Sequence, residues 1–418
     1  MMNMKLSTDN RLVVTGMGAI TPIGNSVEEY WNNLTAGKCG IEKITRFDTS
    51  ELPVKIAGEI KNFEAEKYMP KKLTREMDVF MQYGYAAAME AIAQAGEPAA
   101  EPERMGIVVG TALGGLAPIA ETQDGISKGE HKKVSPRFIP KVIGNEAAAQ
   151  VAIAKGYRGP SLTVSTACSS GGDAISTACM MLMSGQADAV LAMGTESALS
   201  PLFILGLSSA HALSTNNDNP QGASRPFDRD RDGFVIGEGG GALVIETEEN
   251  AKKRGATILA ELAGFANCTD GYHVTSPHPE GIGALFCMEQ AVKNAGLNLE
   301  DVDYINTHGT STPVGDPIET SAVKELFGDH AQEMAVTSTK GATGHMMGAG
   351  GITEAITCIQ CIRTGIVPPT LNLENLDEKC VPLNYVPEKA IEKKVDVAMS
   401  NSFGFGGQNS SVIFKKYN

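Results

Sequence analysis

The chain contains two segments that repeat the same order of elements, and this duplication constrains the fold more than any other feature. In each segment a β-branched run leads through small residues into a helical pattern, at 165–175 and again at 338–352. Each segment then closes with a glycine-rich turn and a last strand, at 237–246 and 404–414. Such repetition is typical of two related units that pack together, although chance similarity of glycine-rich turns is the alternative. We predict a duplicated α/β fold with halves at 1–255 and 256–418.

Short β-branched runs alternate with alanine-rich helical patterns along the whole chain, which indicates an α/β protein. The predicted strands are 11–15, 105–109, 161–165, 189–193, 242–246, 256–265, 302–307, 334–338, 395–400 and 411–415. The predicted helices include 76–94, 171–184, 281–295, 318–327 and 350–363. No low-complexity linker separates the halves, so we expect them to pack as one body.

Composition excludes several classes of protein. The chain has 418 residues, of which 42% are hydrophobic and 20% charged, and this is a globular rather than a disordered composition. No apolar run approaches the roughly 18 residues that cross a bilayer. The first residues lack the apolar segment of a secretion signal, so we expect a cytoplasmic protein. The net charge of −14 argues against nucleic-acid binding.

The eight cysteines are scattered and do not resemble a disulfide framework. Cys358 and Cys361 form a C-x-x-C, but no second pair stands at zinc-finger spacing. The pair lies in a helical pattern of isoleucines, which favours the core of a helix. Metal or redox use is the alternative.

Cys168 stands where a predicted strand ends and an amphipathic helix begins, among small residues. The free N–H groups and the positive end of the helix dipole at such a position favour a thiolate. We therefore take Cys168 as a candidate nucleophile, with a structural cysteine as the alternative.

Two histidines follow strands of the second half. His308 comes after the strand 302–306 in a loop of hydroxyl residues, glycine and proline, at an edge where α/β proteins place catalytic groups. His345 lies five residues after Lys340 in a glycine-rich turn, and Glu354 on the next helix is placed to pair with Lys340 in the interior. Hydrogen-bonded or surface loops are the alternative interpretation of both motifs.

The segment 401–409 places Phe403 and Phe405 between glycines, which indicates a mobile aromatic lid, a backbone N–H donor site or a simple turn.

The duplication places Cys168, His308 and His345 on one edge. One Cys–His pair fits a hydrolase, but a second histidine supplies further donors for an oxyanion or enolate. The set therefore favours carbon–carbon bond chemistry on a thioester.

These motifs resemble those of the β-ketoacyl-acyl-carrier-protein synthase family, which has the thiolase fold. The resemblance runs from about residue 11 to 416 and is carried by the motifs at 13–24, 166–170, 226–235, 308–313, 340–345 and 401–407. It is closest to the synthases that elongate fatty acids, and its Cys–His–His set differs from the Cys–His–Asn of the type III synthases. The resemblance implies two thiolase-like halves in a five-layered α-β-α-β-α body.

The resemblance also implies a ping-pong reaction without any cofactor or metal. Cys168 would accept an acyl chain as a thioester, and backbone N–H groups of Cys168 and Phe405 would form the oxyanion hole. His308 and His345 would stabilise the enolate that malonyl-carrier protein forms on losing CO2. The attack of this enolate would give a 3-oxoacyl-carrier protein. Three supporting roles follow: Lys340 and Glu354 orient the histidines, Phe403 and Phe405 gate the malonyl pocket, and Leu113 lines the acyl tunnel.

The implied partner is an acyl carrier protein, and the implied assembly is a homodimer. Because carrier proteins are acidic and this chain is too, attraction must be local. Family-like docking positions hold Lys72, Arg75, Lys132 and Lys133. Each of them taken singly is more often just a solvated charge, and the docking cluster is a hypothesis.

Some positions depart from the family pattern. Gln408 stands where a threonine is common, and Ser169–Ser170 is a pairing also seen in polyketide synthases. Glu76 stands where a basic docking residue is frequent, and His211 stands where an arginine is frequent. A stand-alone polyketide ketosynthase is therefore the second interpretation. A coenzyme A-dependent thiolase-like enzyme, a nucleotide-binding protein and an inactive partner subunit are less favoured, since G-x-G-x-x-G fails at Thr21 and Cys168 is present.

Overall fold

A central sheet made of two matching sets of strands organises the protein. The computed structural model describes residues 11–97 and 99–418. The sheet has ten strands in the order β10-β9-β13-β14-β8-β1-β7-β6-β4-β5. Their bounds are β1 Leu12–Ile20, β4 Met105–Gly110, β5 Ser161–Val164, β6 Ala189–Glu196, β7 Gly239–Thr247, β8 Ala260–Thr269, β9 Tyr304–Asn306, β10 Ala335–Thr337, β13 Val397–Gly404 and β14 Gln408–Lys415. Two further two-stranded sheets are formed by β2 Glu42–Lys43 with β3 Ile56–Ala57 and by β11 Ile366–Val367 with β12 Ile391–Glu392.

The two sets have the same internal pairing. β4 pairs in parallel with β5 and β6, and β9 pairs in parallel with β10 and β13. β7 then pairs antiparallel with β6 and β1, as β14 does with β13 and β8. The sets meet where β1 pairs antiparallel with β8, with Val14 opposite Ala260. The predicted duplicated α/β fold is therefore confirmed.

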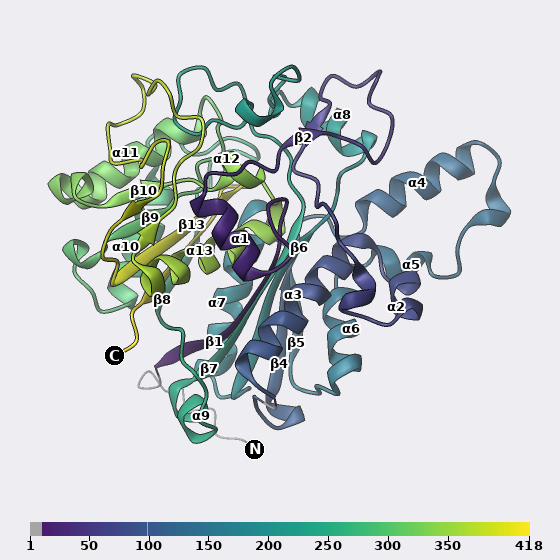
Figure 1. Ribbon diagram of the computed structural model, residues 1–418, viewed down its shortest axis with the longest axis horizontal. Coiled ribbons are helices and arrows are strands. Elements are labelled where there is room, and N and C mark those ends of the chain that lie inside the picture. Colours follow the sequence, from purple (N-terminus) through teal and green to yellow (C-terminus); the bar gives the residue numbers. More distant parts are fainter. Residues whose placement is uncertain (1–10, 98) are drawn as a thin grey trace.

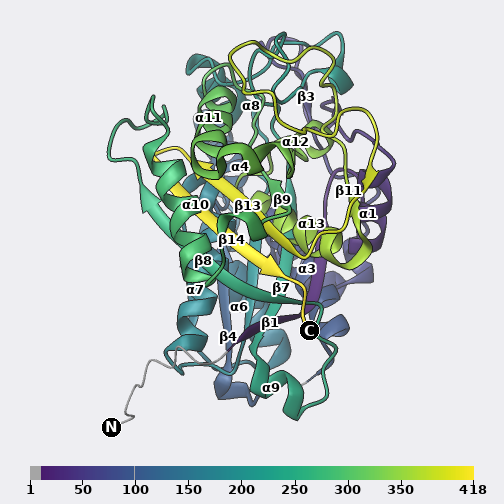
Figure 2. The same ribbon diagram turned by 90° about the vertical axis from the view of Figure 1, so that its left-hand side faces the viewer.

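Helices form three layers around these strands (Figures 1 and 2). The α-helices are α1 Val27–Thr35, α2 Lys71–Glu76, α3 Val79–Ala95, α4 Leu116–Ser127, α5 Phe138–Val142, α6 Glu146–Lys155, α7 Ser170–Met183, α8 Pro201–Ser209, α9 Glu248–Lys253, α10 Ile282–Asn294, α11 Gly315–Phe327, α12 Lys340–Thr343 and α13 Gly350–Thr364. α3 and α6 cover the strands of the first half, and α10 covers strands of the second half with α11 packed against it. Between the halves, α7 packs against α13 and against strands of both halves, which completes the five layers.

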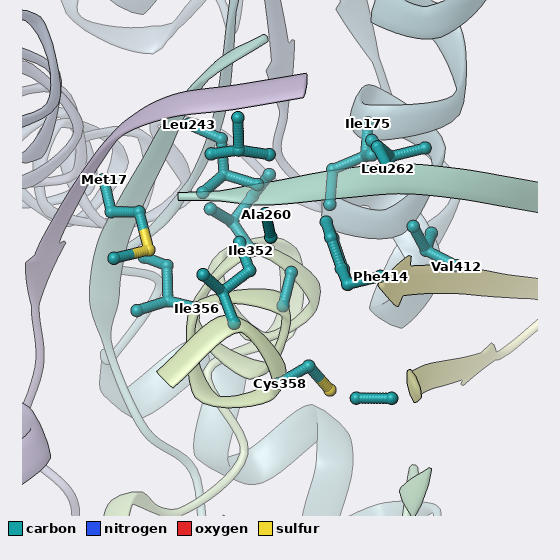
Figure 3. Packing of buried hydrophobic residues seen from close by; sticks show 14 of the residues in the cluster. Met17, Ile175, Leu243, Ala260, Leu262, Ile352, Ile356, Cys358, Val412 and Phe414 are labelled. Atoms are coloured by element: carbon teal, nitrogen blue, oxygen red, sulfur yellow. The ribbon is translucent and has the colours of Figure 1, made fainter. Parts of the chain in front are cut away.

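The middle layer is the most thoroughly buried part of the protein. Every residue of α13 from Gly350 to Ile362 is buried, and Figure 3 shows its isoleucines among side chains from strands of both halves. Cys358 and Cys361 are both 0% exposed there. The helix-core interpretation of the C-x-x-C is therefore confirmed.

The predicted first strand at 11–15 was too short, because Gly16 and Gly18 continue β1 instead of forming a turn. A Cβ on Gly16 would lie 2.0 Å from the carbonyl oxygen of Ala91, and one on Gly18 would lie 1.9 Å from that of Ala87. These glycines therefore let α3 lie directly on the strand.

The predicted helix at 76–94 is also corrected, since Met77 is extended and separates α2 from α3. After β4, the chain leaves the body as an excursion formed by α4 and α5, which Figure 1 shows projecting from the first half. Among the described helices, none combines the length and apolar character of a membrane span.

Candidate active site

Cys168 lies in a strained turn between β5 and α7. It belongs to the short 3-10 helix Ala167–Ser169, and Ala167 before it has a φ of 54°, a left-handed conformation that non-glycine residues rarely adopt. The Ser170 hydroxyl donates to the Ala167 carbonyl and accepts from the Thr166 N–H. The turn is thus held by its own serine, and the sulfur stands at the N-terminal end of α7, as predicted.

The protonation state differs from the prediction. Burial raises the pKa of the Cys168 thiol to about 11, although the backbone N–H of Phe405, the charge of Lys340 and the N–H of Cys168 itself act to lower it. The expectation that the helix end favours a thiolate in the resting protein is therefore wrong. Desolvation of a charged sulfur outweighs the helix end.

Both predicted histidines converge on this sulfur. His308 follows β9 and its Asn306, and His345 follows α12. The Cys168 sulfur and one ring nitrogen of each histidine all lie within 4.8 Å of one another. The two imidazole rings are nearly perpendicular, with centroids 5.2 Å apart. Cysteine and histidine are also donors that Zn²⁺ prefers, so this is the place where a soft metal ion would fit.

Both imidazoles are neutral at ordinary pH. Burial lowers the pKa of His308 and of His345 well below the usual value, and the positive charge of Lys340 lowers both further. Neither ring nitrogen of His345, nor Nδ1 of His308, has a hydrogen-bond partner among the described residues. Neutral imidazoles can accept a proton at one nitrogen and donate from the other.

Lys340 and Glu354 form the predicted interior ion pair. Their side chains are 2% and 3% exposed, and the Lys340 ammonium donates directly to the Glu354 carboxylate. Burial raises the pKa of Glu354, while Lys340 acts to lower it. Pairing lets a buried lysine keep its charge close to the histidines.

Sequence reasoning missed the carboxylates that hold the loop of His308. Glu319 on α11 accepts the backbone N–H groups of His308 and Gly309, both at 2.8 Å. Asp316, at the start of α11, accepts from the N–H groups of Phe227 and Ser311. Only the position of these acids shortly after the histidine motif could have signalled them.

The end of β13 and the turn that joins it to β14 close one side of the site. A Cβ on Gly404 would lie 2.9 Å from the Thr166 carbonyl and 3.1 Å from the Cys168 nitrogen, so this backbone lies against the nucleophile turn. The Phe403 ring is centred 6.2 Å from that of His308, and Phe405 is 37% exposed. Asp270 holds the segment from outside, because its N–H donates to Gly407 and its carboxylate accepts from Asn409.

Cys168, His308, His345, Phe403 and Phe405 line one cavity of about 630 Å³. Leu113 also lines it, as predicted, and is 41% exposed. His211, one of the departures from the family pattern, lies at the same cavity. A further departure, Ser169, bonds to the Thr166 carbonyl and to Asp173, so it supports the turn.

The four predicted docking residues lie outside the cavity. Lys72 and Arg75 are exposed on α2, which also carries Glu76. Lys132 and Lys133 are exposed on the 3-10 helix His131–Lys133 in the excursion between α4 and α5. Lys133 forms an ion pair with Glu130 at 2.7 Å, which reduces its free positive charge.

Two family models together match most of the chain. The N-terminal domain of β-ketoacyl synthases matches residues 9–251, and their C-terminal domain matches residues 259–374. The 3-oxoacyl-[acyl-carrier-protein] synthase 2 of Coxiella burnetii is 45% identical over 97% of this chain and 98% of its own. The protein of that name from Staphylococcus aureus is 44% identical over 99% of this chain and 100% of its own.

Solved structures show the same fold. A β-ketoacyl synthase from Burkholderia phymatum superposes with a TM-score of 0.91 at 34% identity, covering 98% of this chain and all of that one. The ishigamide ketosynthase/chain length factor gives 0.89 at 32% identity, again over 98% of this chain and 100% of its own. The chain therefore belongs to the β-ketoacyl synthase family.

Proposed function

We propose that this enzyme elongates acyl chains by decarboxylative condensation of an acyl-Cys168 thioester with malonyl-acyl-carrier protein. One observation carries the proposal: a buried sulfur and two neutral imidazoles lie within 4.8 Å of one another at the wall of a large cavity. A hydrolase needs one histidine beside its thiol. The second imidazole supplies a donor for the enolate that condensation requires.

In the first half-reaction the Cys168 sulfur attacks the thioester carbonyl of an acyl-carrier protein. Because the thiol is protonated at rest, a neutral imidazole of the pair accepts its proton as the sulfur–carbon bond forms. The N–H groups of Cys168 and Phe405, which both act on the sulfur, hold the oxyanion. The carrier's sulfur–carbon bond then breaks, and its thiol leaves with the proton.

In the second half-reaction His308 and His345 donate hydrogen bonds to the thioester oxygen of malonyl-carrier protein. CO2 leaves, and its bonding electron pair moves into the enolate. The enolate carbon attacks the acyl-Cys168 carbonyl, and the sulfur–carbon bond breaks with its electron pair leaving on sulfur. The Cys168 thiolate then takes up one proton from solvent, which restores the resting thiol. Burial, together with the positive charge of Lys340, keeps both imidazoles neutral. Phe403 and Phe405 gate the space between the two substrates.

The test is a reconstituted reaction with purified acyl- and malonyl-carrier proteins. Mass spectrometry should show an acyl adduct on the enzyme, followed by 3-oxoacyl-carrier protein and one CO2 for each product. Release of free fatty acid without a condensation product would instead establish a hydrolase.

We assign the pathway to fatty acid synthesis in preference to polyketide synthesis. Relatives named 3-oxoacyl-[acyl-carrier-protein] synthase 2 are 44% and 45% identical to this chain. By comparison, a type II polyketide ketosynthase in complex with its acyl-carrier protein is 30% identical, with a TM-score of 0.87. A single malonyl addition in the assay supports the assignment, and repeated additions without reduction would overturn it.

Lys132 and Lys133 are proposed to attract the acidic carrier protein from the exposed excursion. Reversing both to Glu should raise the KM for carrier-bound substrate at low salt and leave kcat little changed, since neither residue lines the cavity. Because exposed charges are screened by salt, the effect should shrink at high ionic strength. Reversing Lys389, a lysine of the second half, is the control. An unchanged KM would remove Lys132 and Lys133 from the docking site.

A homodimer through β5 is also proposed. β5 ends the sheet with residues 161–163 exposed, and Leu162, Met180 and Phe286 are 51%, 52% and 50% exposed. Open sheet edges with apolar side chains favour pairing with another chain. Leu162→Asp should convert a dimer into a monomer by light scattering, whereas Leu376→Asp in the second half should not. A monomeric wild type would refute the proposal.

A further inference from the structure

Glu196, at the C-terminal end of β6, has no role in the chemistry above and yet lies beside the cavity. Glu196 is 1% exposed, and its carboxylate accepts hydrogen bonds from backbone N–H groups. One oxygen accepts from the N–H of Ala112 at 2.6 Å and of Gly348 at 3.3 Å. The other accepts from the N–H of Leu113 at 3.3 Å and from the Thr111 hydroxyl at 3.2 Å. One carboxylate therefore joins two segments that are distant in the sequence.

Both joined segments form the wall of the cavity. Ala112 and Leu113 line it from the segment after β4, and His345 and Met347 line it from the segment before α13. The two backbones are also in direct contact, because a Cβ on Gly348 would lie 2.7 Å from the Thr111 Cα. The Glu196 carboxylate thus stands behind the wall and holds its two parts together.

We infer that Glu196 is a positioning residue for acyl-chain selectivity, which it exerts by fixing the backbone of Ala112 and Leu113 against the segment of His345. This inference rests on the proposed function, because it concerns the acyl chain that Cys168 receives. A carboxylate bonded to several N–H groups holds them more strongly than a neutral acceptor does. A rigid wall discriminates sharply between chains of different length, whereas a loosened wall adapts to several.

Protonation of Glu196 should weaken this attachment. Burial raises the pKa of Glu196 to about 7, while the N–H groups of Ala112, Leu113 and Gly348 and the Thr111 hydroxyl lower it. The negative charge of Glu196 contributes to raising the pKa of the Cys168 thiol, which is about 11. The pKa of His345 lies well below its usual value. Between about pH 6 and about pH 8 neither of these groups changes charge. Burial also raises the pKa of Glu319 to about 7, but its carboxylate holds the His308 loop, so the pH effect that Glu196→Gln removes belongs to Glu196.

The experiment measures the rate of adduct formation on Cys168 with acyl-carrier proteins of four to sixteen carbons. In Glu196→Gln the amide NH2 faces backbone N–H donors and cannot accept from them. The ratio between the adduct rates of the best and the poorest acyl chain should therefore fall by about fivefold or more, which is the effect of one lost charge-assisted hydrogen bond. The same ratio in the wild type should fall as the pH drops from about 8 to about 6, and in the variant it should not change with pH.

The matched control is Glu246→Gln. Glu246 is also fully buried, but it lies opposite Ala189 at the other end of the β6–β7 pair and bonds to Arg254. Its substitution should leave the chain-length ratio unchanged. Because the ratio compares substrates on one protein, a general loss of folded enzyme cancels. If Glu196→Gln does not fold, Glu196→Asp and the wild-type pH series provide the same test.

The outcomes separate this inference from the proposed function. No adduct from any acyl-carrier protein on the wild type would overturn the proposed function. Adducts with a chain-length ratio that neither Glu196→Gln nor pH alters would overturn the role of Glu196 and leave the condensation intact. A wild type that accepts all lengths equally would overturn it as well.

Discussion

Cys168→Ala should abolish the acyl adduct and lower condensation by at least about 10³-fold, because no other group can take the place of an attacking nucleophile. Intact-mass measurement after mixing with acyl-carrier protein checks this directly. Decarboxylation of malonyl-carrier protein should persist in the variant, since His308 and His345 remain. Separating the two activities assigns the sulfur to acyl transfer alone.

The matched control for this variant is Cys179→Ala. Cys179 is a buried cysteine of the same helix, α7, and it does not line the cavity. Cys179→Ala should still form the acyl adduct, because its only change is a smaller buried side chain. An adduct of equal mass on Cys168→Ala would mean that another residue is the nucleophile.

The pKa of Cys168 adds a pH dependence to the same experiment. Because burial raises this pKa to about 11, the thiol is protonated at neutral pH. Alkylation of the free enzyme by iodoacetamide, detected as a mass increase absent from Cys168→Ala, should therefore accelerate from neutral pH upward. A rate that levels off below about pH 7 would show that a thiolate is present at rest, as the helix-end argument alone predicts.

His308→Ala should lower malonyl decarboxylation by about 10²- to 10³-fold, the loss typical of removing one donor to an oxyanion. The acyl adduct should form with a smaller loss, because His345 remains near the sulfur. Release of CO2 and the mass of the enzyme measure the two steps on the same sample.

His330→Ala serves as the control for this substitution. His330 is half-buried, contacts the Val302 carbonyl and does not line the cavity. It should change neither step. If His308→Ala prevented acylation while decarboxylation continued, the proposed role of the imidazole would be wrong.

The local patterns of the sequence predicted most of the fold. Strands such as 105–109 and helices such as 350–363 are found within a residue of their predicted ends, because β-branched runs and apolar periodicity are properties of neighbouring residues. β1 was misjudged at Gly16 and Gly18, where the need for glycine comes from α3, some seventy residues away.

The candidate site was predicted in part. The motifs of Cys168, His308 and His345 were recognisable because each combines a reactive side chain with the small residues of a strand-to-helix turn. Glu319 and Glu196 were missed, since their partners are backbone N–H groups of segments that are remote from them or carry no side-chain signal.

Two repeats, their elements and three reactive loops can be read from this chain alone, since each depends on residues that are close in the sequence. The pairing of β1 with β8, the distances between Cys168 and the two histidines, and the protonation of Cys168 required the folded structure. A pKa depends on how much water distant segments exclude and on which charges they bring near. Those contacts exist only once the two halves have packed on α7 and α13.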